Sequence, residues 1–231
     1  MRRSISLFLF LIPLLGFATP VKFYENGKVG YKNESGSVIV SAEFDYGADF
    51  SEGLALVMLD GKRGFINENG EEVIALQYED ASDFHSGLAR VVVNGKSGFI
   101  NASGETIIPA KYDLAGDFVD GLALVKLNGL AGFIGTNGDV KIALQYEDAS
   151  AFSEGLAAVK LNGNWGFIDE NGTFVIEAKY VYANSFVNGE ALVKKGDELI
   201  YIDKSGKKTR EFYDEEVEEH KKAMRVRRRI F

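Results

Sequence analysis

Short stretches in which apolar and polar residues alternate recur along the chain, and a two-residue turn divides each of them. The clearest copy is the stretch 156–172, LAAVKLNGNWGFIDENG, in which Ala157 and Val159 fall on one face of the first half. Alternation with a period of two predicts a β-strand with one buried face. Asn162 and Gly163 tolerate the positive φ that a type I′ turn requires, so the stretch predicts a β-hairpin.

This pattern returns every 34 residues without an insertion. Five copies have a glycine in the same slot of the second predicted strand: Gly30, Gly64, Gly98, Gly132 and Gly166. All six copies have an aromatic residue in the next slot: Tyr31, Phe65, Phe99, Phe133, Phe167 and Tyr201. Such regularity indicates tandem copies of one unit, which buries its apolar face only by stacking on its neighbours.

A third apolar stretch follows each of the first five hairpins and ends on an aromatic residue, as in the range 71–78. A connecting segment with one phenylalanine and one glycine then leads to the next hairpin, as at Phe84 and Gly87. Each unit is therefore expected to form a three-stranded antiparallel meander with a compact loop. The constant face of the first strand should be buried, and the variable face, which carries residues such as Leu56, should point outward.

The predicted fold class is all-β, with 34-residue three-stranded units stacked as an open, solenoid-like array over residues 20–213. A β-propeller is the alternative, but its blades usually have four strands and it often closes by splitting one blade between the chain ends. The first and last hairpins are both complete here. Residues 214–231 follow the array, and their acidic start and basic end predict a short C-terminal helix.

The stretch 162–172 resembles the WG repeat, which is found in strings in many bacterial proteins. The residues that match the motif are Asn162, Gly163, Trp165, Gly166, Phe167, Ile168, Asp169 and Gly172. In looser form the resemblance covers residues 21–213, and it implies an interaction repeat of unassigned biochemical role. The tryptophan that names the motif occurs only at Trp165, so a tryptophan-based role in every unit is not expected.

The first 18 residues have the three parts of a secretory signal peptide. Arg2 and Arg3 form a basic start, an apolar run covers residues 5–17, and Gly16 and Ala18 place small residues at a cleavage site. A membrane anchor is the alternative, but the run is shorter than the about 20 residues that span a bilayer. The array is therefore predicted to be exported through the inner membrane and to be periplasmic or secreted, with no transmembrane segment after cleavage.

Composition narrows the range of functions. The chain has 46% hydrophobic and 26% charged residues, as globular proteins do, and its formal net charge is −8. An acidic surface repels phosphate backbones, so a nucleic-acid partner is not expected. The chain contains no cysteine, which excludes disulfides, thiolate catalysis and cysteine-ligated metals.

Known catalytic motifs are lacking in the sequence, and its two histidines, His85 and His220, have no nucleophile or metal partner close by in the chain. Acidic residues recur in register instead. One row follows the aromatic residue that ends the third strand: Asp45, Glu79, Asp113 and Glu147. A second row precedes the phenylalanine of the connecting segment: Asp49, Asp83 and Asp117. Repetition favours a structural role in turns, with a cation, a cationic partner or carboxylate catalysis as alternatives.

Two functions from different classes remain. The first is a non-catalytic scaffold that binds a protein or peptide, and the second is a carbohydrate- or cell-wall-binding protein. The chain is expected not to be an enzyme, and no catalytic, cofactor-binding or metal-binding residue is assigned. The candidate binding residues are the private tryptophan, the basic residues of the variable faces and the first acidic row: Trp165, Arg90, Lys126, Lys160, Asp45, Glu79, Asp113 and Glu147.

Overall fold

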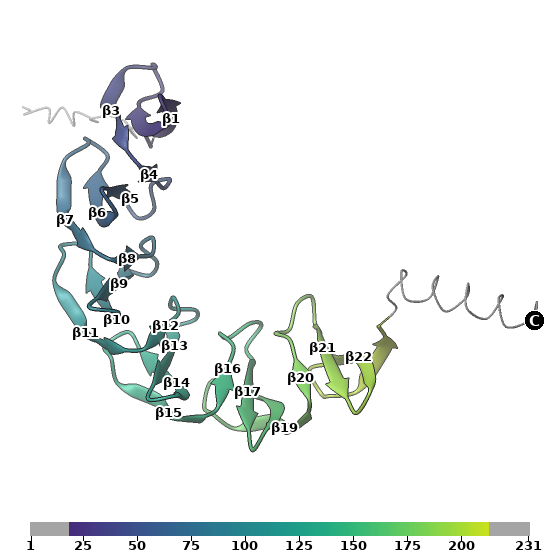
Figure 1. The fold of residues 1–231 in the computed structure, drawn as a ribbon. Coiled ribbons are helices and arrows are strands. Elements are labelled where there is room, and N and C mark those ends of the chain that lie inside the picture. Colours follow the sequence, from purple (N-terminus) through teal and green to yellow (C-terminus); the bar gives the residue numbers. More distant parts are fainter. Residues whose placement is uncertain (1–18, 213–231) are drawn as a thin grey trace, which may run out of the picture.

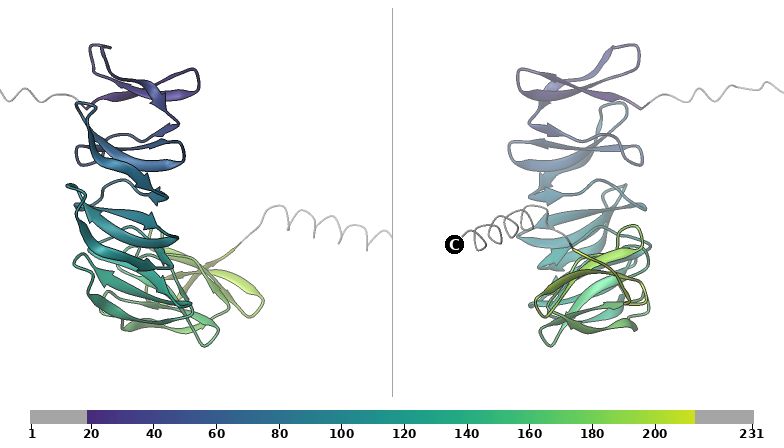
Figure 2. Two further views of the ribbon diagram at one scale, coloured as in Figure 1. Left: turned by 60° about the vertical axis from the view of Figure 1, so that its left-hand side comes forward. Right: turned by 90° about the vertical axis from the view of Figure 1, so that its right-hand side faces the viewer.

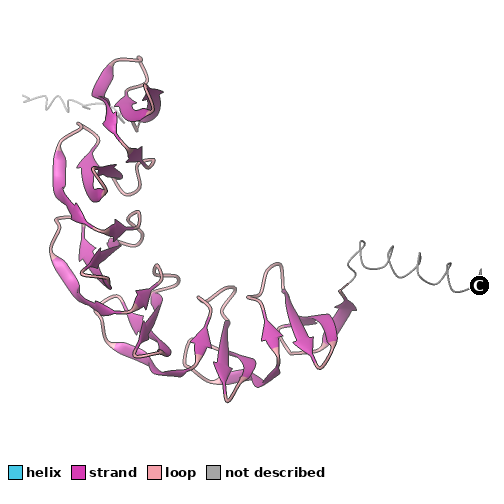
Figure 3. Cartoon of the chain, viewed as in Figure 1, coloured by secondary structure: helices cyan, strands magenta, loops and turns pink. Residues whose placement is uncertain are grey.

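The computed structural model describes residues 19–212, and within them all regular structure is β-strand (Figure 3). Six antiparallel sheets stack one after another along a curved path (Figure 1). The predicted signal peptide, 1–18, and the predicted C-terminal helix, within 214–231, lie outside the described residues.

The first sheet, unit 1, consists of β1 (Val21–Glu25), β2 (Lys28–Lys32) and β3 (Val38–Phe44). Unit 2 consists of β4 (Tyr46–Gly47), β5 (Leu54–Leu59), β6 (Lys62–Asn67) and β7 (Glu72–Tyr78). Unit 3 consists of β8 (Asp80–Ala81), β9 (Leu88–Val93), β10 (Lys96–Asn101) and β11 (Thr106–Tyr112). Unit 4 consists of β12 (Leu114–Ala115), β13 (Leu122–Leu127), β14 (Leu130–Gly135) and β15 (Val140–Tyr146).

Unit 5 consists of β16 (Asp148–Ala149), β17 (Ala157–Leu161), β18 (Asn164–Ile168) and β19 (Phe174–Tyr180). Unit 6 consists of β20 (Tyr182–Ala183), β21 (Glu190–Lys195), β22 (Glu198–Asp203) and β23 (Lys208–Glu211). From unit 2 onward every sheet therefore has one short strand and three longer ones, in chain order.

The three longer strands are the predicted meander, and the short strand is an addition to it. It lies in the connecting segment and pairs with the first strand of the following hairpin, for example through Tyr46 opposite Met58. Two residues are too few to show an alternating pattern, which is why the sequence indicates only a loop there. The predicted type I′ turns are confirmed, since Asn162 and Gly163 have φ values of 50° and 78°.

The array is open, as predicted, and the two ends of the described chain stay apart (Figure 1). The short strands β4, β8, β12, β16 and β20 lie on the concave side of the arc, and the third strands β7, β11, β15 and β19 lie on the convex side (Figure 1). Figure 2 shows the sheets of the N-terminal half as successive layers. The alternative of a closed propeller is therefore wrong for this chain.

The hydrophobic core is divided into five clusters, each between two consecutive sheets. Phe167 and Ile168 are neighbours on β18 that point to opposite faces, yet both are fully buried, one against unit 6 and the other against unit 4. The prediction of an outward variable face is wrong for its centre, because Leu56 and Ala158 are 4% and 1% exposed. Stacking on both sides buries both faces of each of the four inner sheets.

Aromatic pairs connect consecutive units through these cores. The aromatic residue after the recurring glycine slot meets the phenylalanine of the next connecting segment, with ring centroids 4.7 Å apart for Phe133 and Phe152. Unit 6 has no successor among the described residues, and its Tyr201 meets Phe212 at 6.2 Å instead. Arg210 covers the ring of Tyr201, with its guanidinium carbon 3.5 Å from the ring centroid. In the last sheet, a residue of the same sheet therefore covers this aromatic ring.

Candidate interaction surface

The first acidic row has a structural role in the hairpin turns. Glu147 accepts hydrogen bonds from the backbone N–H of Gly163 at 2.9 and 3.2 Å, and Glu79 accepts from Asn94 and Gly95 at 2.9 Å each. Each acid lies just before the short strand of a unit and binds the turn of that unit's own hairpin. These carboxylates satisfy backbone donors that the tight turn leaves unpaired.

Asp45 and Asp113 bind the corresponding turns in the same way. Asp45 accepts from the N–H of Asp60 at 2.9 Å, and Asp113 accepts from that of Asn128 at 2.7 Å. Each also forms an ion pair with a lysine of the preceding hairpin, and these lysines together with the turn N–H groups hold the pKa of both carboxyls below the usual value. The row is therefore occupied by contacts within the chain.

Unit 6 supports this reading of the acids. Val181 occupies the slot of the acid there, and the hairpin turn has changed to Gly196 followed by Asp197. Only Gly196 of these two has a positive φ, at 60°, as a type II′ turn requires. The acid and the Asn-Gly type of turn are thus lost together.

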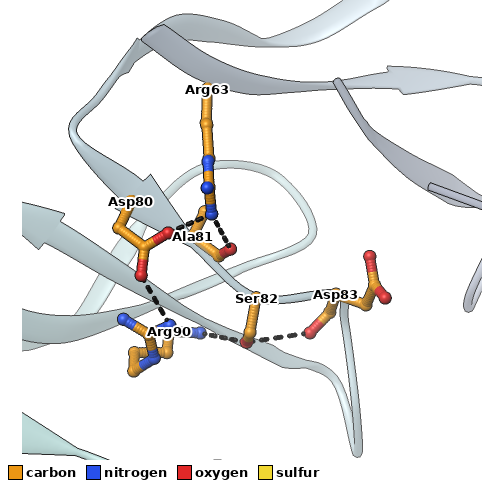
Figure 4. A network of polar contacts seen from close by, with 6 residues as sticks. All are labelled: Arg63, Asp80, Ala81, Ser82, Asp83 and Arg90. Atoms are coloured by element: carbon orange, nitrogen blue, oxygen red, sulfur yellow. Dashed lines mark hydrogen bonds and ion pairs between the residues drawn. The ribbon is translucent and has the colours of Figure 1, made fainter. Parts of the chain in front are cut away.

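Arg90 belongs to an ionic network between units 2 and 3 (Figure 4). Its guanidinium contacts one carboxylate oxygen of Asp80 at 2.8 Å, and Arg63 contacts the other oxygen and donates to the carbonyl of Ala81 at 3.1 Å. Partial burial raises the pKa of Asp80, but the two guanidinium groups outweigh it and hold the pKa below its usual value. Arg90 is thus tied to the edge of its own sheet.

Lys126 and Lys160 surround a second aspartate, Asp148, in the same slot two units further along. Lys126 of unit 4 forms an ion pair with Asp148, and Lys160 lies opposite Asp148 in the strand pairing of β16 and β17. The two ammonium groups and the N–H of Ala149 lower the pKa of Asp148 against the opposing effect of partial burial. The structure therefore brings these two candidate lysines together around one carboxylate.

Trp165 is partly buried and packs against the core between units 5 and 6. It lies between Lys160 and Tyr180 in the cross-strand pairing of its sheet. Arg63 occupies the same slot in unit 2. Trp165 therefore contributes to a junction between two sheets, and the eight candidate residues do not converge on one site.

The concave side carries a row of residues that sequence analysis did not single out. The first residues of the five short strands form this row, which we call the concave strip: Tyr46, Asp80, Leu114, Asp148 and Tyr182. The three apolar members are 46%, 45% and 44% exposed, and the two aspartates are those of the ionic networks. Apolar and ion-paired positions thus alternate from unit to unit. In the sequence, the residue type in this slot varies from unit to unit, whereas the slots beside it vary little. That contrast is the signal that could have singled out these residues.

Of the second acidic row, Asp83 is the least exposed to solvent, and one of its carboxylate oxygens is buried without a hydrogen bond. Burial raises the pKa of Asp83, and the carboxylates of Asp117 and Asp49 raise it further, whereas His85 and Lys22 lower it. Asp49 differs, because its side chain is 83% exposed and lies 3.1 Å from the ammonium of Lys22.

Replacing Asp83 by alanine, the residue at the same slot of unit 5, is expected to increase the free energy of unfolding at neutral pH by about 0.5–1 kcal/mol. Because the folded state raises this pKa, the protonated carboxyl favours folding at low pH, and that contribution is lost as the pH rises through the folded pKa. The gain should therefore shrink on going from about pH 7 to about pH 4. Urea unfolding at both pH values measures it, with Asp49→Ala as the exposed control. A larger gain at the acidic pH would contradict the assignment.

The sequence profile of the WG-containing repeat matches residues 30–62, 64–96, 98–130, 132–165 and 165–198. The chain belongs to the WG-containing repeat family. The five matches follow one another through most of the described array, so each WG repeat corresponds to one step of the stack. No curated protein sequence matches the chain.

Solved structures align with the WG-repeat array at low sequence identity. A crystal structure of a eukaryotic initiation factor aligns with a TM-score of 0.53 and 10% identity over 82% of this chain and 62% of that chain. The dihydro-heme d1 dehydrogenase NirN in complex with DHE aligns with a TM-score of 0.44 and 14% identity over 83% of this chain and 54% of that chain. The WG-repeat array thus spans less than two thirds of either protein, and the likeness to the initiation factor concerns the fold alone.

PorZ, a bacterial surface component of the type-IX secretion system of Porphyromonas gingivalis, aligns with a TM-score of 0.42 and 10% identity. The alignment covers 84% of the WG-repeat chain and 31% of PorZ.

Residues 19–212 of the WG-repeat chain contain no helix that is long and apolar enough to cross a membrane. Across the same residues, histidine, aspartate and glutamate side chains form no group of three that could hold a metal ion.

Proposed function

We propose that the protein is a non-catalytic scaffold that holds an extended segment of a partner protein along the concave side of the WG-repeat array. The concave strip carries this proposal. It repeats once per unit from unit 2 onward, alternates apolar with ion-paired positions and lies along the short strands of successive sheets. A stacked-repeat protein typically binds its partner along such an extended concave surface.

The alternation indicates the chemistry of the partner. Tyr46, Leu114 and Tyr182 offer apolar contact area, and the charged groups around Asp80 and Asp148 offer hydrogen bonds between these positions. A polypeptide supplies both kinds of group along its length. A sugar platform would need aromatic faces in a row, but the repeated tyrosines that end the third strands are buried: Tyr78, Tyr112, Tyr146 and Tyr180.

The proposal includes the place of action. The predicted signal peptide supports export of the array, and we propose that it acts in the periplasm or outside the cell. A chain without cysteine suits an oxidising compartment, because it has no thiol that could form a wrong disulfide.

Site-specific photocrosslinking tests the proposed surface. A photoreactive amino acid at Leu114 of the concave strip should crosslink a protein in the envelope fraction, and the same group at Val140 of the convex strand β15 should not. These two residues are 45% and 55% exposed, so the control is matched in access to solvent.

A set of three substitutions then tests the chemistry of the concave strip. Tyr46→Ser, Leu114→Ser and Tyr182→Ser together should reduce partner capture at least tenfold, about 1.4 kcal/mol of binding free energy. The convex set Val73→Ser, Val140→Ser and Val175→Ser should leave it unchanged, since these exposed valines lie on the opposite side of the sheets. Equal loss in both sets, or capture of polysaccharide alone, would overturn the proposal.

A further inference from the structure

Five loops follow the short strands, at 48–53, 82–87, 116–121, 150–155 and 184–189, and we call them the rim loops. They share one backbone conformation. Each ends with a residue at positive φ followed by a glycine at positive φ, for example Glu52 at 53° and Gly53 at 82°. An isolated bridge also joins each loop to the residue that follows it, such as the bridge between Ser51 and Leu54. Differences between these loops therefore arise from their side chains.

Two pairs of rim loops are joined by the same set of side-chain hydrogen bonds, which we call a staple. In the first staple, the Ser51 hydroxyl donates to the carbonyl of Phe84 at 2.7 Å, and the Glu52 carboxylate accepts from the N–H of Gly87 at 2.9 Å. This staple connects unit 2 with unit 3.

The second staple connects unit 5 with unit 6 through the equivalent residues. The Ser153 hydroxyl donates to the carbonyl of Phe186 at 2.7 Å, and the Glu154 carboxylate accepts from the N–H of Gly189 at 3.0 Å. Lys204 of unit 6 adds an ion pair to Glu154 at 3.1 Å. The pairing of serine with glutamate therefore marks a stapled junction.

The two junctions around unit 4 have no staple. The serine and glutamate are replaced by His85 and Ser86 in unit 3 and by Val119 and Asp120 in unit 4. Over residues 19–212, no hydrogen bond connects the rim loop 82–87 with 116–121, or 116–121 with 150–155. Asp83 and Asp117 add like charges to the first of these junctions, where no hydrogen bond joins the two loops.

Ion pairs and aromatic pairs cross stapled and unstapled junctions alike. The ion pairs are Arg63–Asp80 between units 2 and 3, Lys96–Asp113 between units 3 and 4, and Lys126–Asp148 between units 4 and 5. The aromatic pairs have centroid distances of 4.8 Å between units 2 and 3, 4.8 Å between units 3 and 4, and 4.7 Å between units 4 and 5. Unit 1 is tied to unit 2 in its own way, because the Tyr31 hydroxyl donates to the carbonyl of Ala48 at 2.8 Å and Lys22 pairs with Asp49. The staple is therefore the element that distinguishes the junctions around unit 4.

We propose that the array bends at the two junctions on either side of unit 4, so that units 1–3 and units 5–6 form two stiffer arms. Aromatic packing at these junctions tolerates small tilts, whereas short directional hydrogen bonds between backbone and side chain do not. The bend would adjust the curvature of the concave side. It is a property of the free protein and holds whether or not the proposed partner segment binds there.

Distance measurements between matched labels test the hinge. The chain has no cysteine, so two engineered cysteines can carry spin labels without background. Glu43, Lys111 and Lys179 occupy the same exposed slot on β3, β11 and β19. The pair Glu43→Cys with Lys111→Cys spans the two tied junctions, and the pair Lys111→Cys with Lys179→Cys spans the two unstapled ones.

Pulsed spin-resonance measurements on the full mature chain should give a distance distribution about twofold broader for the second pair than for the first. Equal widths would overturn the proposal. The comparison is internal because both pairs span two repeat units and use the same label sites.

Adding the missing staples should remove the difference. The variant carries His85→Ser, Ser86→Glu, Val119→Ser and Asp120→Glu. The loops already provide the carbonyls that would accept from the new serines and the N–H groups that would donate to the new glutamates. Glutamate already adopts this turn conformation at Glu52 and Glu154, with φ of 53° and 54°. The second distribution should narrow to the width of the first, and Ser51→Ala with Glu52→Ala should broaden the first. An unchanged width in a variant with native circular dichroism would also overturn the proposal, and neither outcome depends on partner capture.

Discussion

Replacing Gly132 by alanine is expected to lower the free energy of unfolding by about 2–4 kcal/mol. An added Cβ would lie 2.7 Å from the carbonyl oxygen of Ile142 and 2.8 Å from the carbonyl carbon of Ala143. Both atoms belong to the backbone of the neighbouring strand, so they move only if the strand pairing is disrupted. The same close approach recurs at the equivalent glycine of units 1, 2, 3 and 5, at 2.5–2.6 Å.

Sheet register explains why this slot needs glycine in five units and accepts Ile200 in the sixth. The pairing of β14 with β15 shifts register between Ala131 and Phe133, which brings the bulged backbone over Gly132, and it shifts again between Phe133 and Ile134. In unit 6 Ile200 pairs directly with Glu211, and β22 and β23 shift register only once, after Tyr201. Unit 6 therefore lacks the register shift at this slot, and it also lacks the glycine.

Urea unfolding measures the effect of Gly132→Ala, and Gly135→Ala on the same strand is the control. A Cβ at Gly135 would meet the flexible Lys141 side chain at 2.7 Å, and units 2 and 3 have Asn67 and Asn101 in this slot. We expect the control to cost less than about 1 kcal/mol. Equal losses in the two variants would show that backbone approach is not the cause.

Phe133→Ala is expected to cost about 3–5 kcal/mol. The side chain is fully buried between units 4 and 5 and stacks at a tilt on Phe152, so its removal leaves a cavity and also removes the aromatic pair. Because each unit contacts only its neighbours, the loss should concentrate at this junction.

Hydrogen exchange measured along the chain distinguishes a local from a uniform effect of Phe133→Ala. Protection should fall most in β14–β17, on both sides of the junction, and least in β1–β3. Leu130→Ala on the same strand is the control, because Leu130 is 42% exposed and its loss should cost under about 1 kcal/mol. A uniform loss of protection over the array would contradict a nearest-neighbour stack.

The hairpins and their order could be predicted from the sequence because the relevant signals are local. Asn162-Gly163 fixes a turn, and alternation fixes the strands on either side of it. The short strands could not be predicted, since two residues show no period. The five-cluster core was also missed, because an alternating strand indicates one buried face and gives no sign that the next sheet covers the other.

The candidate residues illustrate the same limit. Arg90 and Lys160 are charged residues of the variable face, and their charge suggests that this face points outward. In the structure both belong to junctions at which charged groups pair around an aspartate. Glu147 was predicted to serve a turn, and the structure shows which turn, that of its own unit 16 residues downstream. A period of 34 residues gives the repeat length but not which slots of consecutive copies meet in space. For the same reason, the sequence could not show that the residues of the concave strip form one row.

The short strand also determines how such a chain can change its length. It joins the sheet of one unit while following directly in the chain from the last strand of the preceding unit, as β12 follows β11. Excision or duplication of any 34-residue stretch therefore leaves every remaining sheet with a complete set of strands, wherever in the period the cut falls. Unequal recombination within the gene could then lengthen or shorten the arc one unit at a time, because the existing kinds of turn and core would serve the new array.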